Sequence, residues 1–398
     1  MQRDFINKRW VTGSLAVILA SLVLSSAAGA GAKKQDAKKA KASQPPVIEL
    51  MWPEPPETPR IKVAEILTNE LDLGRKITGR ELFMKFLTGA QVAVKQIYQP
   101  RDLVVSDDGN RIYASDFGTQ AIFIFDREQK KVRTYPSERP FGLALDDQEN
   151  LYVVEQLNKR IQVYDKQGNK IRTITSDKLI RPTDATIDRP RKLLYVADPA
   201  LKTSPEHTVK VFDLEGKLLR TVGKGKGTCV GCLFFPTYVA TDKDGNVYVT
   251  STLNSRVDKF DLQGNYLRTF GARGDGFGMF DKPKGVAIDS FGNIHVADSG
   301  WSNVQIFNQK GEVLLFYGGR GNYPGLMKNP TGITIDKDNK IYVADYLNYR
   351  IMVYQLVNTT AEDSYITPPP PGDKNAKPQV AKKEDQKDLG RAAAAVPK

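Results

Sequence analysis

From about residue 98 onward, short apolar runs alternate with polar turns along the chain. In the stretch after Pro283, the runs are rich in Val, Ile, Tyr and Phe, and the sequences DSFGN, DSGWS and NQKGE separate them. Short runs of β-branched and aromatic residues between clusters of Asp, Asn and Gly indicate antiparallel strands joined by turns. The strands expected in this stretch are residues 286–288, 294–297, 304–307 and 313–317.

This four-strand unit recurs along the chain. The sequence PKGVAIDSFGNIHVAD aligns with PTGITIDKDNKIYVAD and with PTYVATDKDGNVYVTS. Four short strands repeated at a nearly constant spacing are typical of a β-propeller, in which each repeat forms one blade. We therefore predict an all-β fold, a six-bladed β-propeller of four-stranded antiparallel blades over residues 98–356. The six copies begin at Pro100, Pro140, Pro182, Pro236, Pro283 and Pro330.

The last copy lacks its outermost strand, because a proline-rich sequence follows soon after Tyr354. Residues 60–68, RIKVAEILT, form an isolated apolar run ahead of the repeats. We predict that this N-terminal strand pairs with residues 350–354 and closes the ring, which removes two exposed sheet edges at once.

Residues 69–97 connect this closing strand to the first copy. Within them, Leu82, Phe83, Phe86 and Leu87 fall on one side of a helix, and Arg80, Glu81 and Lys85 fall off that side. The pattern predicts one short amphipathic helix near the mouth of the central channel. We expect it to pack against the propeller, with a movable lid as the alternative.

The two ends of the chain read as segments outside the fold. Residues 1–32 have basic residues, a short apolar stretch and small residues in an A-x-A arrangement, which is typical of a secretory signal peptide. Residues 33–59 form a Lys/Ala- and Pro-rich linker, and residues 357–398 a low-complexity disordered tail. We expect an exported monomer, periplasmic or extracellular, with no integral membrane span after signal cleavage.

The formal net charge of +12 raises nucleic acid as a possible partner. The surplus is divided among both ends and the central region, with no dense basic stretch within the repeats. This distribution is typical of a solvated surface, so no nucleic-acid partner is expected.

Residues 330–354 resemble the NHL repeat family, whose motif runs roughly PxGIAIDxxGxIYVADxxNxRIxVF. The copies that begin at Pro140, Pro236 and Pro283 match this motif well, whereas the first and third copies depart from it. The resemblance implies a propeller that mediates protein contacts. The matching positions in the last copy include Pro330, Gly332, Asp336, Tyr342, Asp345, Asn348 and Arg350.

The chain has two cysteines, Cys229 and Cys232, in the Gly-rich connection between the third and fourth copies. Leu233 stands where haem attachment would need a histidine, and the chain has only two histidines to complete a zinc site. We predict a disulfide that staples the loop. A redox-active pair is the alternative, since Lys224 and Lys226 could lower a thiol pKa.

Departures from the repeat point to a ligand site. Asp102, Asp184 and Tyr238 replace the glycine that follows P-x in the motif, and arginines lie beside three leading prolines. We predict that they form an aromatic-edged depression at the channel mouth, suited to a peptide, a sugar or a small anion. The alternative is that these charges pair with one another. The arginines are Arg101, Arg139 and Arg181.

A second set of acidic residues follows the second strand of most copies. Because these residues recur with the motif, we expect them to cap turns and not to bind a ligand. They are Asp116, Glu155, Asp198, Asp298 and Asp345.

Two functions remain open at this point. The first is a non-catalytic scaffold of the cell envelope that binds an unidentified envelope or extracellular protein or glycan. The alternative is a metal-dependent (calcium-type) lyase or lactonase, as some six-bladed relatives are, with calcium held through Asp102 and Asp184. No other cofactor is expected.

Overall fold

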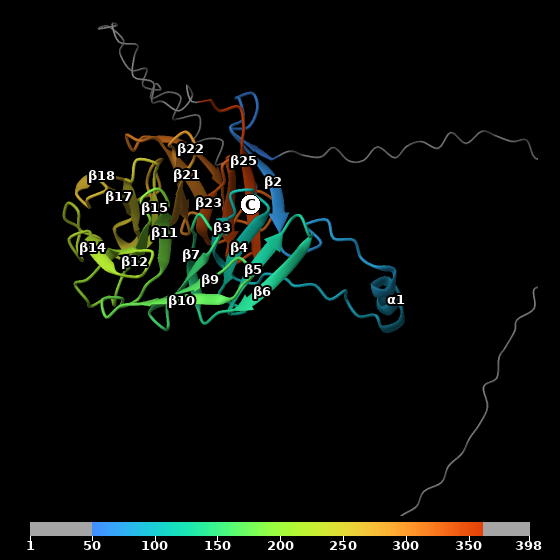
Figure 1. Ribbon diagram of the computed structural model, residues 1–398. Helices are drawn as coiled ribbons and strands as arrows, with labels where there is room; N and C mark the ends of the chain where they lie inside the picture. Colours follow the sequence, from blue (N-terminus) through green and yellow to red (C-terminus); the bar gives the residue numbers. More distant parts are fainter. Residues whose placement is uncertain (1–49, 361–398) are drawn as a thin grey trace, which may run out of the picture. The chain divides into compact units, whose positions relative to one another are not determined.

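The computed structural model describes residues 50–360, and their strands form six antiparallel sheets, the blades of a propeller (Figure 1). Blades 1 to 5 each contain four strands, paired in chain order. The predicted all-β architecture and the number of blades are both confirmed. Each blade starts at the central axis with the strand that follows a leading proline.

The inner strands are β3 (Pro100–Val105), β7 (Pro140–Leu145), β11 (Asp184–Asp188), β15 (Pro236–Thr241), β19 (Pro283–Ile288) and β23 (Pro330–Ile335). The second strands are β4 (Arg111–Asp116), β8 (Leu151–Glu155), β12 (Leu193–Asp198), β16 (Val247–Ser251), β20 (Ile294–Asp298) and β24 (Lys340–Asp345). The third strands are β5 (Ala121–Asp126), β9 (Arg160–Tyr164), β13 (Thr208–Asp213), β17 (Arg256–Phe260), β21 (Asn303–Phe307) and β25 (Arg350–Leu356). The outer strands of blades 1 to 5 are β6 (Lys131–Pro136), β10 (Lys170–Thr175), β14 (Leu218–Val222), β18 (Tyr266–Phe270) and β22 (Val313–Gly318), and a short 3-10 helix, η1 (Thr252–Asn254), follows β16.

Blade 6 is completed from the N-terminal side, as predicted. Strand β2 (Ile61–Leu67) pairs antiparallel with β25, with Ile61 opposite Leu356 and Leu67 opposite Ile351. A two-residue strand, β1 (Met51–Trp52), then adds a fifth strand outside β2. Trp52 packs against the rings of Tyr317 and Tyr354. Strand structure therefore begins at Met51, within the segment that was expected to be linker.

The core lies between the blades. Six clusters of buried apolar side chains each join two neighbouring blades, including one between blade 6 and blade 1. A strand places alternate side chains on its two faces, so a blade packed between two others needs apolar residues on both. This requirement explains why the second and third strands are buried along almost their whole length.

Three outer-to-inner connections share one loop form on the same face of the ring, which we call the loop-rich face. Each contains an isolated parallel bridge, and the pairs are Lys226 with Leu233, Arg273 with Phe280, and Arg320 with Met327. The turns between second and third strands lie on this face too, because successive antiparallel strands reverse direction.

The predicted helix is α1 (Gly79–Thr88), and it begins with a capping box between Thr78 and Glu81 and ends at the left-handed Gly89. Our expectation that it packs against the propeller is wrong, because no residue of α1 is buried. Only the base of its loop is anchored, where Ile97 N donates to the Thr68 carbonyl and Ile97 itself is fully buried.

The expected signal peptide, most of the linker and nearly all of the C-terminal tail lie outside the described residues. Within residues 50–360, the model contains no helix whose length and hydropathy would let it cross a bilayer.

Candidate functional site

Three of the predicted site residues fill the axis of the ring. They are Asp102, Asp184 and Tyr238, which lie at equivalent places near the start of β3, β11 and β15. Each is buried, with an exposed fraction of 4% to 6%. The Tyr238 hydroxyl reaches from blade 4 to blade 1 and donates to the Arg101 carbonyl at 3.0 Å. A tyrosine therefore spans the axis, and the centre of the ring is occupied by protein.

The two aspartates form a buried carboxyl pair. Asp102 accepts a hydrogen bond from Leu143 N at 2.7 Å, and Asp184 accepts one from Val239 N at 2.9 Å. The two carboxyl groups also lie within hydrogen-bonding reach of each other. Burial raises the pKa of Asp102 to about 7 and raises that of Asp184 well above its ordinary value. Near neutral pH the pair therefore shares a proton.

Neighbouring glycines make room for this pair. A Cβ atom at Gly142 would lie 2.3 Å from the Asp184 Cα, and one at Gly332 would lie 2.6 Å from the Asp102 Cα. Gly142 of blade 2 and Gly332 of blade 6 thus leave the space that Asp184 of blade 3 and Asp102 of blade 1 occupy.

Above this plug, the predicted arginines rest on aromatic rings. The Arg101 guanidinium carbon lies 3.8 Å from the Phe141 ring centre and 5.8 Å from that of Phe117. Arg139 lies 5.6 Å from the same Phe117 ring. Arg181 lies 5.4 Å from the ring of Phe235. All six predicted residues therefore gather at the channel mouth.

The alternative, in which these charges pair with one another, is present only as a longer-range interaction between Arg101 and Asp102. Within residues 50–360, none of Arg101, Arg139 and Arg181 makes a salt bridge. Their guanidinium N–H groups can still donate, because the aromatic contacts use only the faces of the groups.

Lys284 joins this group, although the sequence alone did not mark it as a site residue. It lies on β19 at the repeat position that Arg101 occupies on β3. Burial, together with the charges of Arg101 and Lys282, lowers the pKa of Lys284 to about 8. A comparison of all six copies at the residue after the leading proline would have shown both cations. We call Arg101, Arg139, Arg181 and Lys284 the cationic rim.

The second set of carboxylates caps turns, as expected. Asp198 accepts from the backbone N–H groups of Ile180 and Arg181, both at 2.8 Å. Asp116, Asp298 and Asp345 accept from the segments before their own inner strands in the same way, and Glu155 accepts from Ser137. These oxygens are already used by the fold.

A metal ion does not fit the acidic and histidine residues of the described chain. Among residues 50–360, no group of three or more His, Cys, Asp or Glu side chains is placed to hold one. Calcium takes six to eight oxygen ligands, whereas Asp102 and Asp184 offer two carboxyls already bonded to backbone N–H groups. His207 Nδ1 accepts from Phe235 N, and His295 contacts Asp289 inside the fold.

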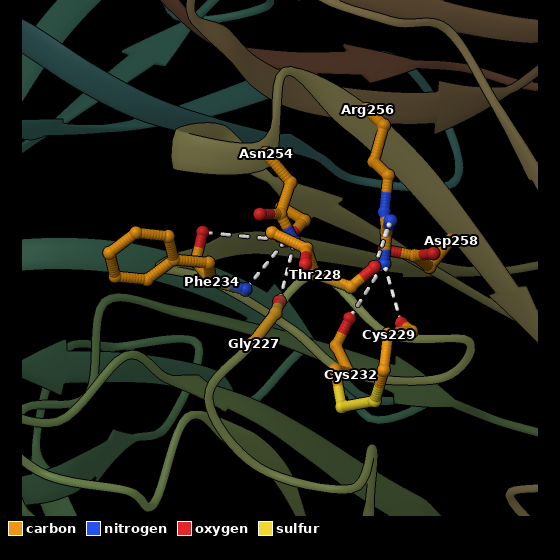
Figure 2. Close-up of a disulfide and its surroundings, with 9 residues drawn as sticks. Gly227, Thr228, Cys229, Cys232, Phe234, Asn254, Arg256 and Asp258 are labelled. Atoms are coloured by element: carbon orange, nitrogen blue, oxygen red, sulfur yellow. Dashed lines mark hydrogen bonds and ion pairs between the residues drawn. A yellow bond between two sulfur atoms is a disulfide. The ribbon is translucent and has the colours of Figure 1, made fainter.

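Cys229 and Cys232 form the predicted disulfide (Figure 2). Arg256 holds the same loop, since its guanidinium donates to the carbonyls of Thr228, Cys229 and Cys232 at 2.8 to 3.2 Å and pairs with Asp258. Arg350 makes the equivalent contacts in the loop before β23, which has no cysteine. An arginine at the start of the third strand therefore holds two of the three loops, and the disulfide is an addition to one of them.

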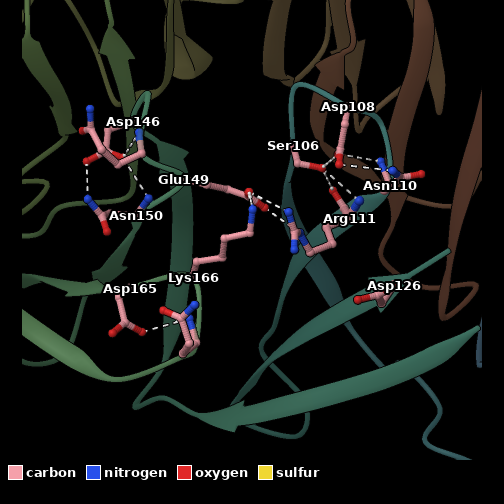
Figure 3. A network of polar contacts seen from close by, with 12 residues as sticks. Ser106, Asp108, Asn110, Arg111, Asp126, Asp146, Glu149, Asn150, Asp165 and Lys166 are labelled. Atoms are coloured by element: carbon pink, nitrogen blue, oxygen red, sulfur yellow. Dashed lines mark hydrogen bonds and ion pairs between the residues drawn. The ribbon is translucent and has the colours of Figure 1, made fainter. Parts of the chain in front are cut away.

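A cavity of about 240 Å³ lies on the opposite face, between the first turns of blades 1 to 3. Its three cations pair with carboxylates. Glu149 binds Arg111 at 2.6 Å and Lys166 at 2.8 Å (Figure 3), and Arg189 binds Asp107. Because each of its three cations is already paired with a carboxylate, this cavity is a weaker candidate than the cationic rim for capture of an anionic ligand.

Comparisons with known families agree with this architecture. Residues 104–317 match the SMP-30/gluconolactonase/LRE-like region, and residues 327–354 match the NHL repeat. The second match falls on the copy whose resemblance was clearest. No curated protein matches the chain.

Many solved structures share the fold. A protein of unknown function from Bacteroides thetaiotaomicron is 16% identical with a TM-score of 0.54, over 67% of this chain and 71% of that one. Virginiamycin B lyase from Staphylococcus aureus is 13% identical with a TM-score of 0.48, over 68% of this chain and 86% of that one. Since 1280 chains match, likeness of fold alone selects no activity.

Proposed function

Because the chain belongs to the SMP-30/gluconolactonase/LRE-like family, whose fold here is a six-bladed propeller, we propose that it binds a ligand at the mouth of its central channel. It acts as a non-catalytic scaffold in the cell envelope, and it recognises an anionic group on a partner protein or glycan. The observation that carries this proposal is the cationic rim, whose four members make no salt bridge within residues 50–360, and whose arginines lie over aromatic rings. Asp102 and Asp298 act on the charges of Arg101 and Lys284 at longer range.

The chemistry of the rim fits carboxylate or similar planar anions. Guanidinium groups present N–H donors in a fork that matches a carboxylate, and aromatic rings behind them hold the fork in place. Phe117 and Phe235, which are partly exposed, also offer apolar faces on which a sugar or peptide backbone could rest.

A location outside the cytoplasm is part of the proposal. It rests on the signal-like sequence of residues 1–32 and on the Cys229–Cys232 disulfide, which persists in oxidising compartments.

Titration calorimetry with two defined probes tests the binding site. A glucuronate-containing oligosaccharide and an acidic peptide are compared with a neutral oligosaccharide and an uncharged peptide. We expect binding of at least one acidic probe, weakened roughly tenfold by Arg181→Gln because one charge-assisted hydrogen bond is lost. Arg268→Gln, at an exposed arginine of outer strand β18, is the matched control and should bind as the unchanged protein does. Equal affinity for neutral and acidic probes would reject the proposal.

The family match favours one second function, a lactonase or lyase. Elemental analysis of the purified protein, combined with an assay of sugar-lactone hydrolysis, separates the two. Stoichiometric calcium together with turnover would replace the scaffold by an enzyme.

A further inference from the structure

The apolar side chains of α1 have no cover within the described structure. Leu82, Phe83, Met84, Phe86 and Leu87 are between 48% and 84% exposed. Four of them, Leu82, Phe83, Phe86 and Leu87, lie on one side of the helix and make an exposed apolar patch of the kind that marks an interaction surface.

The helix is nevertheless well defined. Its N-terminus has both hydrogen bonds of a capping box, and Gly89 N donates to the Lys85 carbonyl at its C-terminus. Arg75 pairs with Glu81 at 3.0 Å and with Glu70 at 3.5 Å, which ties the helix to its loop base. The exposed patch therefore belongs to a helix that is capped at both ends and tied to its loop base by an ion pair.

The charges around the helix are almost all positive. Between residues 75 and 95, Glu81 is the single acidic residue, and it is already paired with Arg75 and Thr78. Four basic side chains of this segment have no carboxylate partner among the described residues. They are Lys76, Arg80, Lys85 and Lys95.

The order of charges around the helix is informative. At 100° per residue, Leu82, Phe83, Phe86 and Leu87 span an arc of about 140°. Arg80 and Lys85 lie at its two borders, while Glu81 and Thr88 lie on the far side. Cations at both edges of an apolar arc suit a helix that lies flat in a bilayer surface, where long basic side chains reach the headgroups.

We propose that α1 docks the protein on an anionic lipid surface, with Leu82, Phe83, Phe86 and Leu87 inserted and Arg80 and Lys85 at the headgroups. The base of the loop follows Leu67, which is opposite Ile351 at the start of β25 and hence at the loop-rich face. Docking therefore anchors the protein through the face that carries the channel mouth. This proposal is independent of the ligand at the cationic rim.

Sedimentation with sucrose-loaded vesicles tests it on the purified protein. We expect binding to vesicles that contain phosphatidylglycerol, weak binding to pure phosphatidylcholine, and loss of binding as salt is raised. Phe83→Ser combined with Phe86→Ser should lower the partition coefficient on the order of tenfold or more. Arg80→Gln with Lys85→Gln should abolish the preference for the anionic lipid.

Matched controls show whether the effect belongs to the helix. Leu157→Ser and Tyr323→Ser remove exposed apolar side chains from other loops, 59% and 73% exposed, and should bind vesicles as the unchanged protein does. Because the α1 side chains do not pack, all variants should unfold at the same denaturant concentration. Equal vesicle binding by the double Phe variant would overturn the proposal. Concentration-dependent dimers in light scattering that this variant abolishes, without vesicle binding, would also overturn it and identify a second copy as the occupant.

Discussion

Asp102 and Asp184 are acidic side chains in a site that disfavours their charge. Both are buried, and each is near the other. A carboxyl group with a raised folded pKa binds more protons when folded than when unfolded, so its contribution is complete below the ordinary pKa of 3.8 and is lost as the pH rises toward about 7.

We therefore expect the free energy of unfolding to carry a declining component between pH 4 and 7, of about 1.4 kcal/mol per pH unit for one proton. Asp184→Asn keeps an oxygen for Val239 N and removes one ionisation. Urea unfolding at pH 5 and pH 8 should show a smaller loss in this variant than in the unchanged protein. Parallel pH profiles for the two proteins would contradict the buried pair.

Lys284 adds a pH dependence to ligand binding. Its pKa of about 8 means that it loses its charge in mildly alkaline solution. Affinity for an acidic probe should fall several-fold from pH 7 to pH 9, and Lys284→Met should have low affinity and little slope over the same range. Calorimetry at both pH values measures this. A slope that persists in the Met variant would assign the titration to another group.

The sequence predicts which single residues are unusual, but not the contacts that they make between blades. Asp102, Asp184 and Tyr238 stood out because they break a repeat. The contact of Arg101 with Phe141 could not be found in this way, since it joins two blades and depends on how their inner strands are oriented. Similarly, the raised pKa of Asp102 needs the burial that only the closed ring provides.

Among the elements, the Gly-rich loop before β15 is stabilised more by Arg256 than by the Cys229–Cys232 disulfide. Arg256 donates to three loop carbonyls and pairs with Asp258, which is completely buried. The disulfide closes only a very short segment, for which the chain-entropy model gives about 2 kcal/mol.

Arg256→Ala should consequently lower the free energy of unfolding by about 3 kcal/mol, because it leaves Asp258 buried without its partner. Cys229→Ser with Cys232→Ser should cost about 2 kcal/mol or less. Urea denaturation of both variants, with Arg268→Ala as the exposed control, ranks the effects. The reverse order would make the disulfide the main support of the loop.

The elements also divide into those that periodicity predicts and those that it does not. The strands of the repeats and the presence of a helix between residues 69 and 97 follow from patterns over many residues. Strand β1 has only two residues, Met51 and Trp52, in a proline-rich segment, so no period marks it. The exposure of α1 cannot be predicted from the sequence either, because an amphipathic pattern does not indicate which surface the apolar side of a helix contacts.

At the scale of the whole molecule, the ring depends on β2. Deleting residues 50–68 would leave the edge of β25 and the blade 5 to blade 6 cluster without Ile61. We expect a lower unfolding midpoint and self-association through the open edge. Calorimetry and light scattering measure both.

Replacing residues 76–94 by a short Gly-Ser linker is the matched control for this deletion. It removes a similar length of chain but no buried residue. Its midpoint should stay that of the unchanged protein. If the two deletion variants have the same unfolding midpoint, closure by β2 is not what stabilises the propeller.

The pairing of β2 with β25 also concerns biosynthesis. The two partners stand at opposite ends of the propeller sequence, so a ribosome adding 5 to 20 residues per second needs roughly 15 to 60 s between them. Throughout that interval β2 has left the ribosome but β25 has not been synthesised, so the toroid is incomplete. A nascent chain of this kind cannot close its propeller until synthesis of the repeats is nearly complete.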